Sequence, residues 1–354
     1  MKVNFVGLSN SGSLSNFSAQ TLVVFSSQKE NQTAIHPKSF AKDLQSSIAD
    51  GAISGKHLES VFFRDKNLLQ SQHLLSVGLG SQKSLKADDA FEFFRAVGAV
   101  VHDQLKAAKV KEALVPLDEL PFALEPISLR AFVEGLWLAS YNFDELKSKP
   151  KAVEKSADKA AKKSGKGEES SELMIHLATK EAAKAPLKKA FQDALTVGES
   201  VNFSRRLGDL PGNLMTPSIL ADEVVKAAKG SKLKVTVWDG ARIVKERMGG
   251  LAGVARGSSE EARFIIMEYQ GAAKSEKPLV YVGKGLTFDT GGISIKPSAG
   301  MEEMKYDMCG GANVIGALLA ISRLGLKVNA IGLVAASENM PSGSATKPGD
   351  VHYA

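Results

Sequence analysis

Apolar side chains in the first 145 residues follow two different spacings. Short apolar runs predict β-strands at Val3–Val6, Thr21–Phe25, Leu74–Leu79 and Ala113–Leu117. Apolar residues spaced three and four apart predict helices over Phe40–Ala49, Ala87–Ala108 and Leu129–Ser140. Strands that alternate with helices are typical of a layered, mostly parallel sheet. Residues 1–145 are therefore predicted to form an N-terminal α/β domain.

The same alternation returns in residues 173–354 and predicts a second α/β domain. Helices are expected at Ala182–Leu207, from Thr216 or Ser218 as cap through Val225, at Ala241–Met248 up to the Gly249–Gly250 pair, and at Val314–Leu324. Strands are expected at Lys234–Trp238, Phe264–Tyr269, Leu279–Val282 and Val328–Ala335. In such a fold, ligands bind at the loops that follow the carboxyl ends of the strands.

Residues 146–172 separate the two predicted domains and are rich in lysine, serine and alanine. The segment has too few large apolar side chains to offset the entropy cost of ordering it, so it is predicted to be a linker or exposed loop. Residues 147–166 contain eight lysines and only two acidic residues, Glu154 and Asp158. The resulting excess of six positive charges equals the whole chain's net charge of +6. Any contact of 147–166 with nucleic acid should be weak and salt-sensitive.

Overall composition limits the class of protein. A hydrophobic content of 44% in 354 residues allows two domains, each with its own core. No apolar run approaches the roughly 18 residues of a membrane helix, and the N-terminus lacks the apolar core of a signal peptide. We therefore expect a cytoplasmic protein with no membrane partner.

Cysteine and histidine contribute little candidate chemistry. Cys309 is the only cysteine, which excludes internal disulfides and cysteine-clustered zinc sites. It is either a small packed residue or a reactive thiol, with no histidine near it in sequence. The histidines His36, His57, His73 and His102 are scattered, so structural roles are expected for them.

The most unusual stretch is Val282–Asn313, which follows a predicted strand and leads into a predicted helix. It holds seven glycines from Gly283 to Gly311. Its charged side chains include Lys284, Asp289, Lys296 and Asp307. A glycine-rich loop past a strand end is a usual place for an α/β protein's chemistry.

Three readings of this stretch compete with a metal site. The triplet Asp289-Thr290-Gly291 is shared with aspartic proteases, but those enzymes need a second triplet that this chain lacks. A phosphate-binding loop needs G-x-x-x-x-G-K-[ST], which is absent. A solvated loop explains the glycines but not the paired lysines and aspartates.

A metal site explains these residue types better. Aspartates bind hard divalent cations, and one carboxylate can bridge two of them. A lysine amine can also coordinate once burial and nearby cations have removed its proton. A second, protonated lysine would polarise a carbonyl or stabilise its tetrahedral intermediate. The residues therefore favour a metal-dependent hydrolase.

Four segments of the second domain resemble the leucyl aminopeptidases, also called cytosol aminopeptidases. The longest is VGKGLTFDTGGISIKPSAGMEEMKYDMCGGANVIGAL, which is similar to the central motif of that family. The others, in chain order, are NFSRRLGDLPGNLMTPSILADEV, MGGLAGVARGSSEEARFIIMEY and ASENMPSGSATKPGDV. The resemblance implies a macro-like N-terminal α/β domain and a catalytic α/β domain whose mixed, mainly parallel sheet is incomplete here.

Position by position, the resemblance implies that Lys284 and Asp307 each bind a metal ion and that Asp289 bridges two. Lys296 is implied as the catalytic lysine that acts on the scissile carbonyl. The implied cofactors are two divalent ions, Mn²⁺ or Zn²⁺ with Mg²⁺ as an alternative. Peptides with leucine-like N-terminal residues are the implied substrates, and a homo-hexamer is the implied assembly.

One family motif has no counterpart in the chain. The family completes its metal site with N-T-D-A-E-G-R-L, expected soon after Gly349-Asp350-Val351, whereas this sequence ends GDVHYA. Two carboxylate ligands and one arginine are thus lacking. We expect a C-terminally truncated form without aminopeptidase activity. The alternative is a non-catalytic DNA-binding or structural protein of the same family.

Overall fold

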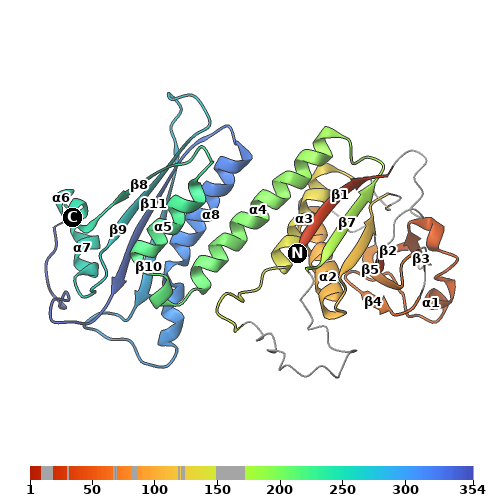
Figure 1. Ribbon diagram of the computed structural model, residues 1–354, viewed down its shortest axis with the longest axis horizontal. Helices are drawn as coiled ribbons and strands as arrows, with labels where there is room; N and C mark the ends of the chain where they lie inside the picture. The colour runs from red at the N-terminus through yellow and green to blue at the C-terminus, as the bar shows by residue number, and fades with distance from the viewer. Residues whose placement is uncertain are drawn as a thin grey trace, which may run out of the picture. The chain divides into compact units, whose positions relative to one another are not determined.

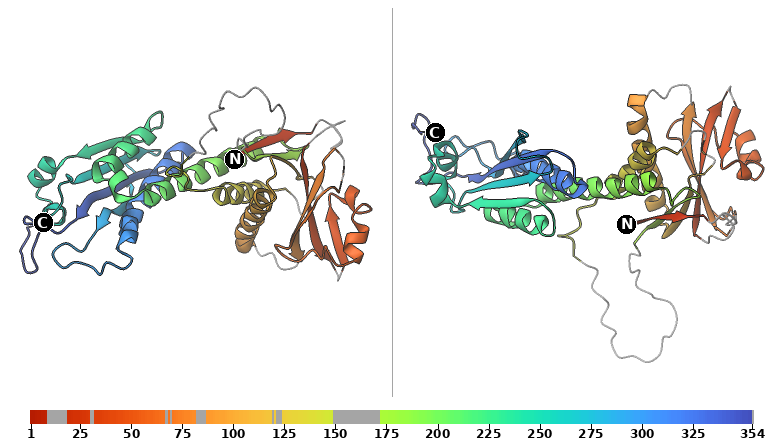
Figure 2. Two further views of the ribbon diagram at one scale, coloured as in Figure 1. Left: turned by 60° about the horizontal axis from the view of Figure 1, so that its bottom comes forward. Right: turned by 90° about the horizontal axis from the view of Figure 1, so that it is seen from above.

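The computed structural model divides into two compact units, Met1–Leu195 and Thr196–Ala354. It describes residues 1–8, 19–29, 32–66, 68, 70–81, 87–118, 120, 124–148 and 172–353. Figures 1 and 2 show both units as α/β folds, as predicted from the alternation of strands and helices. Most of the lysine-rich segment, residues 149–171, lies outside the described part, so the linker and nucleic-acid expectations stay expectations.

The first unit is built on a seven-stranded sheet in the order β1-β7-β6-β2-β5-β4, with β3 paired to β2. The strands are β1 (Lys2–Gly7), β2 (Thr21–Lys29), β3 (Gln32–His36), β4 (Ser60–Phe63), β5 (His73–Ser81), β6 (Glu112–Pro116) and β7 (Met174–Thr179). The pairs β1–β7, β7–β6, β6–β2 and β2–β5 are parallel. Strand β3 pairs antiparallel with β2, and β4 pairs antiparallel with β5. The sheet is mixed and mainly parallel.

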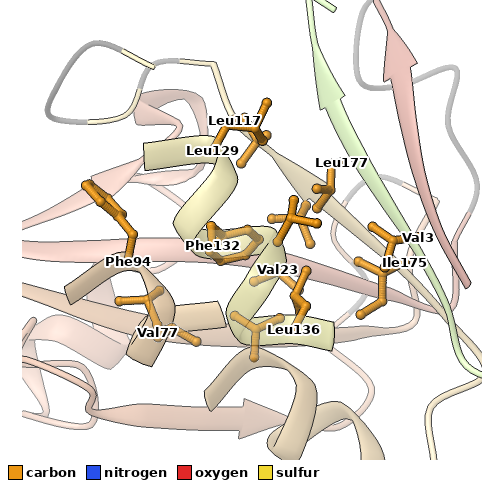
Figure 3. Close-up of a cluster of buried hydrophobic side chains, with 14 of the residues drawn as sticks. Val3, Val23, Val77, Phe94, Leu117, Leu129, Phe132, Leu136, Ile175 and Leu177 are labelled. Atoms are coloured by element: carbon orange, nitrogen blue, oxygen red, sulfur yellow. The ribbon is translucent and has the colours of Figure 1, made fainter. Parts of the chain in front are cut away.

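Helices of the first unit cover this sheet and close its core. They are η2 (Lys38–Phe40), α1 (Gln45–Ala49), α2 (Ala87–Ala107), α3 (Pro126–Ala139) and the first part of α4 (Ala185–Asp209). Figure 3 shows the main core, in which Phe94 of α2 and Phe132 of α3 lie against Val23, Val77 and other strand residues. All four of these side chains are buried. The observed helix α1 is shorter than the predicted helix over 40–49, because it begins only at Gln45.

The boundary between the units differs from the one expected at residue 173. Strand β7 pairs in parallel with both β1 and β6, so it completes the first sheet. Because α4 begins soon after β7, the division falls inside this helix, between Leu195 and Thr196. The segment after the lysine-rich stretch therefore begins with the last strand of the first unit.

The second unit holds a four-stranded sheet in the order β10-β11-β9-β8. Its strands are β8 (Lys234–Trp238), β9 (Arg263–Gln270), β10 (Leu279–Asp289) and β11 (Asn329–Asn339). The sheet is mixed, but in the described residues only β10–β11 is parallel, whereas a mainly parallel sheet was expected. A parallel connection needs about a dozen residues or more. The loop 271–278 between β9 and β10 is shorter and has no helix, so β10 reverses direction relative to β9.

Helices of the second unit are α5 (Pro217–Ala228), α6 (Gly240–Lys245), α7 (Gly249–Ala255) and α8 (Cys309–Leu324), with the 3-10 helices η4 (Gly212–Leu214) and η5 (Met301–Met308). Thr216 caps α5 by accepting from the Ile219 N–H, as predicted. The glycine pair 249–250 begins α7 rather than ending the previous helix, because the left-handed backbone of Arg247 (φ 59°) already separates α6 from α7. Within the described residues, no helix is long and apolar enough to span a bilayer.

Strand β10 forms one edge of this sheet. Leu279, Val280, Tyr281 and Val282 are all exposed, with Val282 at 75%. Beyond Val282 the strand becomes buried where η5 and α8 pack against it. The exposed half and the charged half of β10 are thus different parts of one strand.

Candidate functional site

The candidate site lies where the parallel strands β10 and β11 end together. In their register, Asp289 at the end of β10 is opposite Asn339 at the end of β11. Lys284 lies earlier on β10, opposite Ala335. Parallel strands present their carboxyl ends at one edge of a sheet, so the sheet brings Asp289 to the place predicted for ligand binding.

Glycines let the following segment return close to β10. A Cβ on Gly283 would lie only 2.6 Å from Gly310 O, and a Cβ on Gly311 would lie 3.0 Å from Lys284 O. Side chains at these positions would separate the start of α8 from the strand. The close approach places the end of η5, and with it Asp307, beside Lys284.

Lys284 and Asp307 form the first charged pair of the site. Lys284 Nζ donates to Asp307 Oδ1 at 2.7 Å. The second carboxylate oxygen, Asp307 Oδ2, is buried and has no hydrogen-bond partner among the described residues. An unsatisfied buried carboxylate oxygen is costly, and a bound cation is one way to satisfy it.

Asp289 is held by three donors. Lys296 Nζ lies 2.5 Å from Asp289 Oδ2, while the Gly291 N–H and Asn339 Nδ2 donate to Oδ1 at 2.9 and 2.8 Å. Burial acts to raise the pKa of Asp289, but the hydrogen bonds from Lys296, Gly291 and Asn339, with the nearby Asp307 carboxyl, lower it to about 2. Asp289 is therefore an anion throughout the physiological range.

Lys296 reaches Asp289 from a tight turn. Gly291 and Gly292 have φ values of 89° and 72°, which favour glycine, and the Lys296 N–H donates to Thr290 O at 2.9 Å. Lys296 Nζ also lies 3.2 Å from Asp289 O and 3.2 Å from Met304 Sδ. The structure thus brings Lys284, Asp289, Lys296 and Asp307 together as two lysine–aspartate pairs.

Asn339 is a site residue that the sequence-based prediction missed. It lies 50 residues from Asp289 and binds it across the two parallel strands. The available signal was a polar side chain just beyond a predicted apolar strand, inside one of the segments with family resemblance. Among the described residues, no three His, Cys, Asp or Glu side chains gather as a metal site would require, so the cluster depends on its lysines.

A cavity of about 370 Å³ opens beside this cluster. Gly291, Gly292 and Asn339 line one part of it, and Thr346 and His352 line another. The Thr346 Oγ1 and His352 Nε2 atoms are 3.3 Å apart. The cavity provides space for a molecule larger than water beside Gly291 and Asn339, the two residues that donate to Asp289 Oδ1.

Cys309 has the surroundings of a packed residue. Burial raises the pKa of its thiol, and the negative charges of Asp209 and Asp307 act in the same direction. A Cβ on Gly208 would lie 3.0 Å from Cys309 Sγ. A raised pKa disfavours the thiolate that a nucleophilic cysteine requires.

Both parts of the chain match profiles of one protein family. Residues 202–354 match the cytosol aminopeptidase family, catalytic domain, and residues 21–150 match its N-terminal domain. A probable cytosol aminopeptidase of Bdellovibrio bacteriovorus is 51% identical over 339 residues, which are 94% of this chain and 64% of that protein. One of Paraburkholderia xenovorans is 36% identical, covering 93% of this chain and 61% of its own length. The chain thus spans less than two thirds of either relative.

Solved structures agree with this assignment. The bottromycin maturation enzyme BotP in complex with Mn matches with a TM-score of 0.73 and 26% identity, over 95% of this chain and 63% of its own. A tomato leucine aminopeptidase variant matches in fold with a TM-score of 0.76 and 23% identity, over 99% of this chain and 65% of its own. Together with the two profile matches, which divide the chain between them in the expected order, these similarities show that the chain belongs to the cytosol aminopeptidase family.

Proposed function

We propose that this chain carries the N-terminal domain and part of the catalytic domain of a metal-dependent aminopeptidase, and that its lysine–aspartate cluster binds divalent cations. The observation that carries the proposal is the pairing of Asp289 and Asp307 with two lysines around a buried, unpartnered Asp307 Oδ2. The structural similarity to the bottromycin maturation enzyme BotP, which was solved in complex with Mn, supports a divalent metal of this kind.

The residues present suit such ions. Carboxylate oxygens are hard ligands, and both oxygens of Asp289 accept hydrogen bonds that hold the carboxylate in place. In the proposed assignment, Lys284 and Asp307 would each hold one ion, and Asp289 would hold both. Mn²⁺ and Zn²⁺ are the proposed ions, with Mg²⁺ as the alternative. When bound, such ions lower the pKa of a water and polarise a carbonyl.

Lys296 is the proposed catalytic residue. In the structure its ammonium group is held by Asp289 and by the backbone oxygen of the same residue, which keep it in one place. A protonated amine fixed beside a scissile carbonyl stabilises the negative charge that develops on the carbonyl oxygen. Asn339 and the Gly291 N–H keep the Asp289 carboxylate oriented while Lys296 does this.

Substrate, assembly and location form the remaining part of the proposal. The family membership supports peptides with leucine-like N-terminal residues as substrates, a homo-hexameric assembly and a cytoplasmic location. Three metal-binding side chains are few for two ions, so we expect the 354-residue chain by itself to show no leucine p-nitroanilide hydrolysis.

Metal binding is the direct test. Isothermal titration of the purified chain with Mn²⁺ should show binding that is strongly reduced in Asp289→Asn and Asp307→Asn. Asp350→Asn is the matched control, because Asp350 pairs with Lys347 in an exposed loop. Absence of Mn²⁺ binding, or equal loss in the control, would contradict the proposal. Hydrolysis of leucine p-nitroanilide by the pure chain would contradict the expected inactivity.

A further inference from the structure

The support of helix η5 is unusual for a segment that carries a proposed metal ligand. η5 spans Met301–Met308 as a 3-10 helix, although 3-10 runs longer than about four residues are uncommon because their hydrogen bonds are poorly aligned. Its N-cap residue, Gly300, makes no side-chain cap bond. Residues 297–300, just before it, are exposed. Contacts outside the helix must therefore fix the position of Asp307.

Besides its contacts with β10, η5 binds the last turn of α4. Lys305 Nζ donates to the backbone oxygen of Asp209 at 2.9 Å, and Tyr306 OH donates to Asp209 Oδ1 at 3.2 Å. Cys309, two residues after Asp307, packs against Gly208. The residues on both sides of Asp307 are thus attached to Gly208 and Asp209.

The contacts of Lys305 and Tyr306 with the end of α4 are chemically suited to holding η5 in place. The C-terminal end of a helix carries unpaired carbonyl oxygens and partial negative charge, so a lysine ammonium group binds there favourably. Lys305 Nζ also lies 4.7 Å from the centre of the Tyr306 ring, so the two donors stabilise each other's position. Both then converge on one residue, Asp209.

We propose that Asp209 is a positioning residue for the metal site, which holds η5 through Lys305 and Tyr306 so that Asp307 meets Lys284. This inference rests on the proposed metal-binding function. It assigns no contact with substrate or metal to Asp209, and none of these three residues belongs to the lysine–aspartate cluster. Groups that orient a metal ligand commonly contribute ten- to hundred-fold to metal affinity.

The test compares two minimal variants with matched controls. Tyr306→Phe removes only the hydroxyl, and Lys305→Met removes the amine but keeps the stem. Tyr269→Phe removes a comparable hydroxyl bond, to Leu326 O at 2.9 Å, and Lys234→Met removes an exposed ion pair with Glu268. Mn²⁺ affinity should fall about ten-fold in each of the first two variants, the size of an orienting contact, and stay unchanged in the controls.

A second measurement separates this inference from the metal-binding proposal. Amide hydrogen exchange of the metal-free protein should be faster over Met301–Met308 in Tyr306→Phe and Lys305→Met than in Tyr269→Phe. If the unaltered chain binds no Mn²⁺, the metal-binding proposal fails, and exchange alone decides the positioning role. Unchanged exchange over η5, or unchanged Mn²⁺ affinity in a chain that binds Mn²⁺, overturns that role.

Discussion

Lys284 Nζ lies 2.7 Å from Asp307 Oδ1, although the two residues are 23 positions apart. The pair joins the middle of β10 to the last turn of η5, and both of its members are proposed metal ligands. The ammonium group occupies one carboxylate oxygen while the other has no partner among the described residues. The unpartnered oxygen is therefore the atom of Asp307 at which the proposed cation would meet a carboxylate that is already in place.

Replacing that carboxylate should remove most of the metal affinity. Asp307→Asn keeps the size of the side chain but loses its charge, and we expect Mn²⁺ affinity to fall by at least about 100-fold, beyond the range seen for groups that only orient a ligand. Isothermal titration measures the loss. Lys347→Met, which breaks an exposed ion pair with Asp350, serves as the control and should bind Mn²⁺ as the unaltered chain does.

Asn339 is expected to affect metal affinity by orienting the Asp289 carboxylate. Asn339→Ala removes the 2.8 Å hydrogen bond to Asp289 Oδ1, and we expect Mn²⁺ affinity to fall about ten-fold because the carboxylate is less well oriented. Asn339→Asp should be worse, since it replaces a donor by a second negative charge. Asn329→Ala is the comparison, because the described hydrogen bonds of the Asn329 side chain all go to the 272–276 loop. Equal affinity losses at 329 and 339 would argue against a specific role.

Local signals predicted part of this fold well. The predicted strand Lys234–Trp238 is the observed β8, and Thr216 caps α5 as its position before Pro217 indicates. These features depend on neighbouring residues. Lys284, Asp289, Lys296 and Asp307 were singled out from the sequence as candidate site residues, and the structure forms the pairs Lys284–Asp307 and Lys296–Asp289, while their roles stay a prediction.

Contacts between distant segments could not be predicted in the same way. The Asn339–Asp289 bond depends on the register of β10 against β11, which no local pattern fixes. Tyr306 and Asp209 are 97 residues apart. Strand β7 was missed because its apolar run is short and follows the lysine-rich segment, so only its pairing with β1 and β6 shows which unit it completes.

The close approach of α8 to β10 predicts a large effect at Gly283. A methyl group there would lie 2.6 Å from Gly310 O, a backbone atom that cannot move without shifting the helix. We expect Gly283→Ala to destabilise the chain by about 3 kcal/mol, at the upper end of overpacking costs. Urea unfolding followed by circular dichroism measures the change. Gly343→Ala, where a Cβ meets nothing within 4 Å, should be nearly neutral.

His102 gives the first unit a pH-dependent stability. It is buried in α2, and burial lowers its pKa below the ordinary value, although the adjacent Asp103 raises it. The unfolded chain therefore takes up this proton first as pH falls. The stability contribution is complete above about pH 6.5 and declines below it, by at most about 1.4 kcal/mol per pH unit.

Variants at this position test the sign of that dependence. His102→Gln should flatten the loss of stability between neutral and mildly acidic pH in thermal unfolding. Asp103→Asn removes the charge that favours protonation, with Asp103 Oδ1 3.0 Å from His102 Nδ1, so it should lower the folded-state pKa further and extend the loss to lower pH. A steeper loss in His102→Gln would contradict this account.

The exposed half of β10 should promote self-association. Among the described residues, β11 pairs with one side of β10 and no strand pairs with the other, while Val280 and Val282 are 54% and 75% exposed. An uncharged apolar edge strand can pair with other chains, and a lysine on the edge prevents this. Val282→Lys should therefore reduce the oligomeric fraction seen by light scattering as concentration rises. Val244→Lys is the control, because Val244 is 65% exposed but lies on α6. An equal reduction by both variants would assign the association to exposed apolar surface in general rather than to the β10 edge.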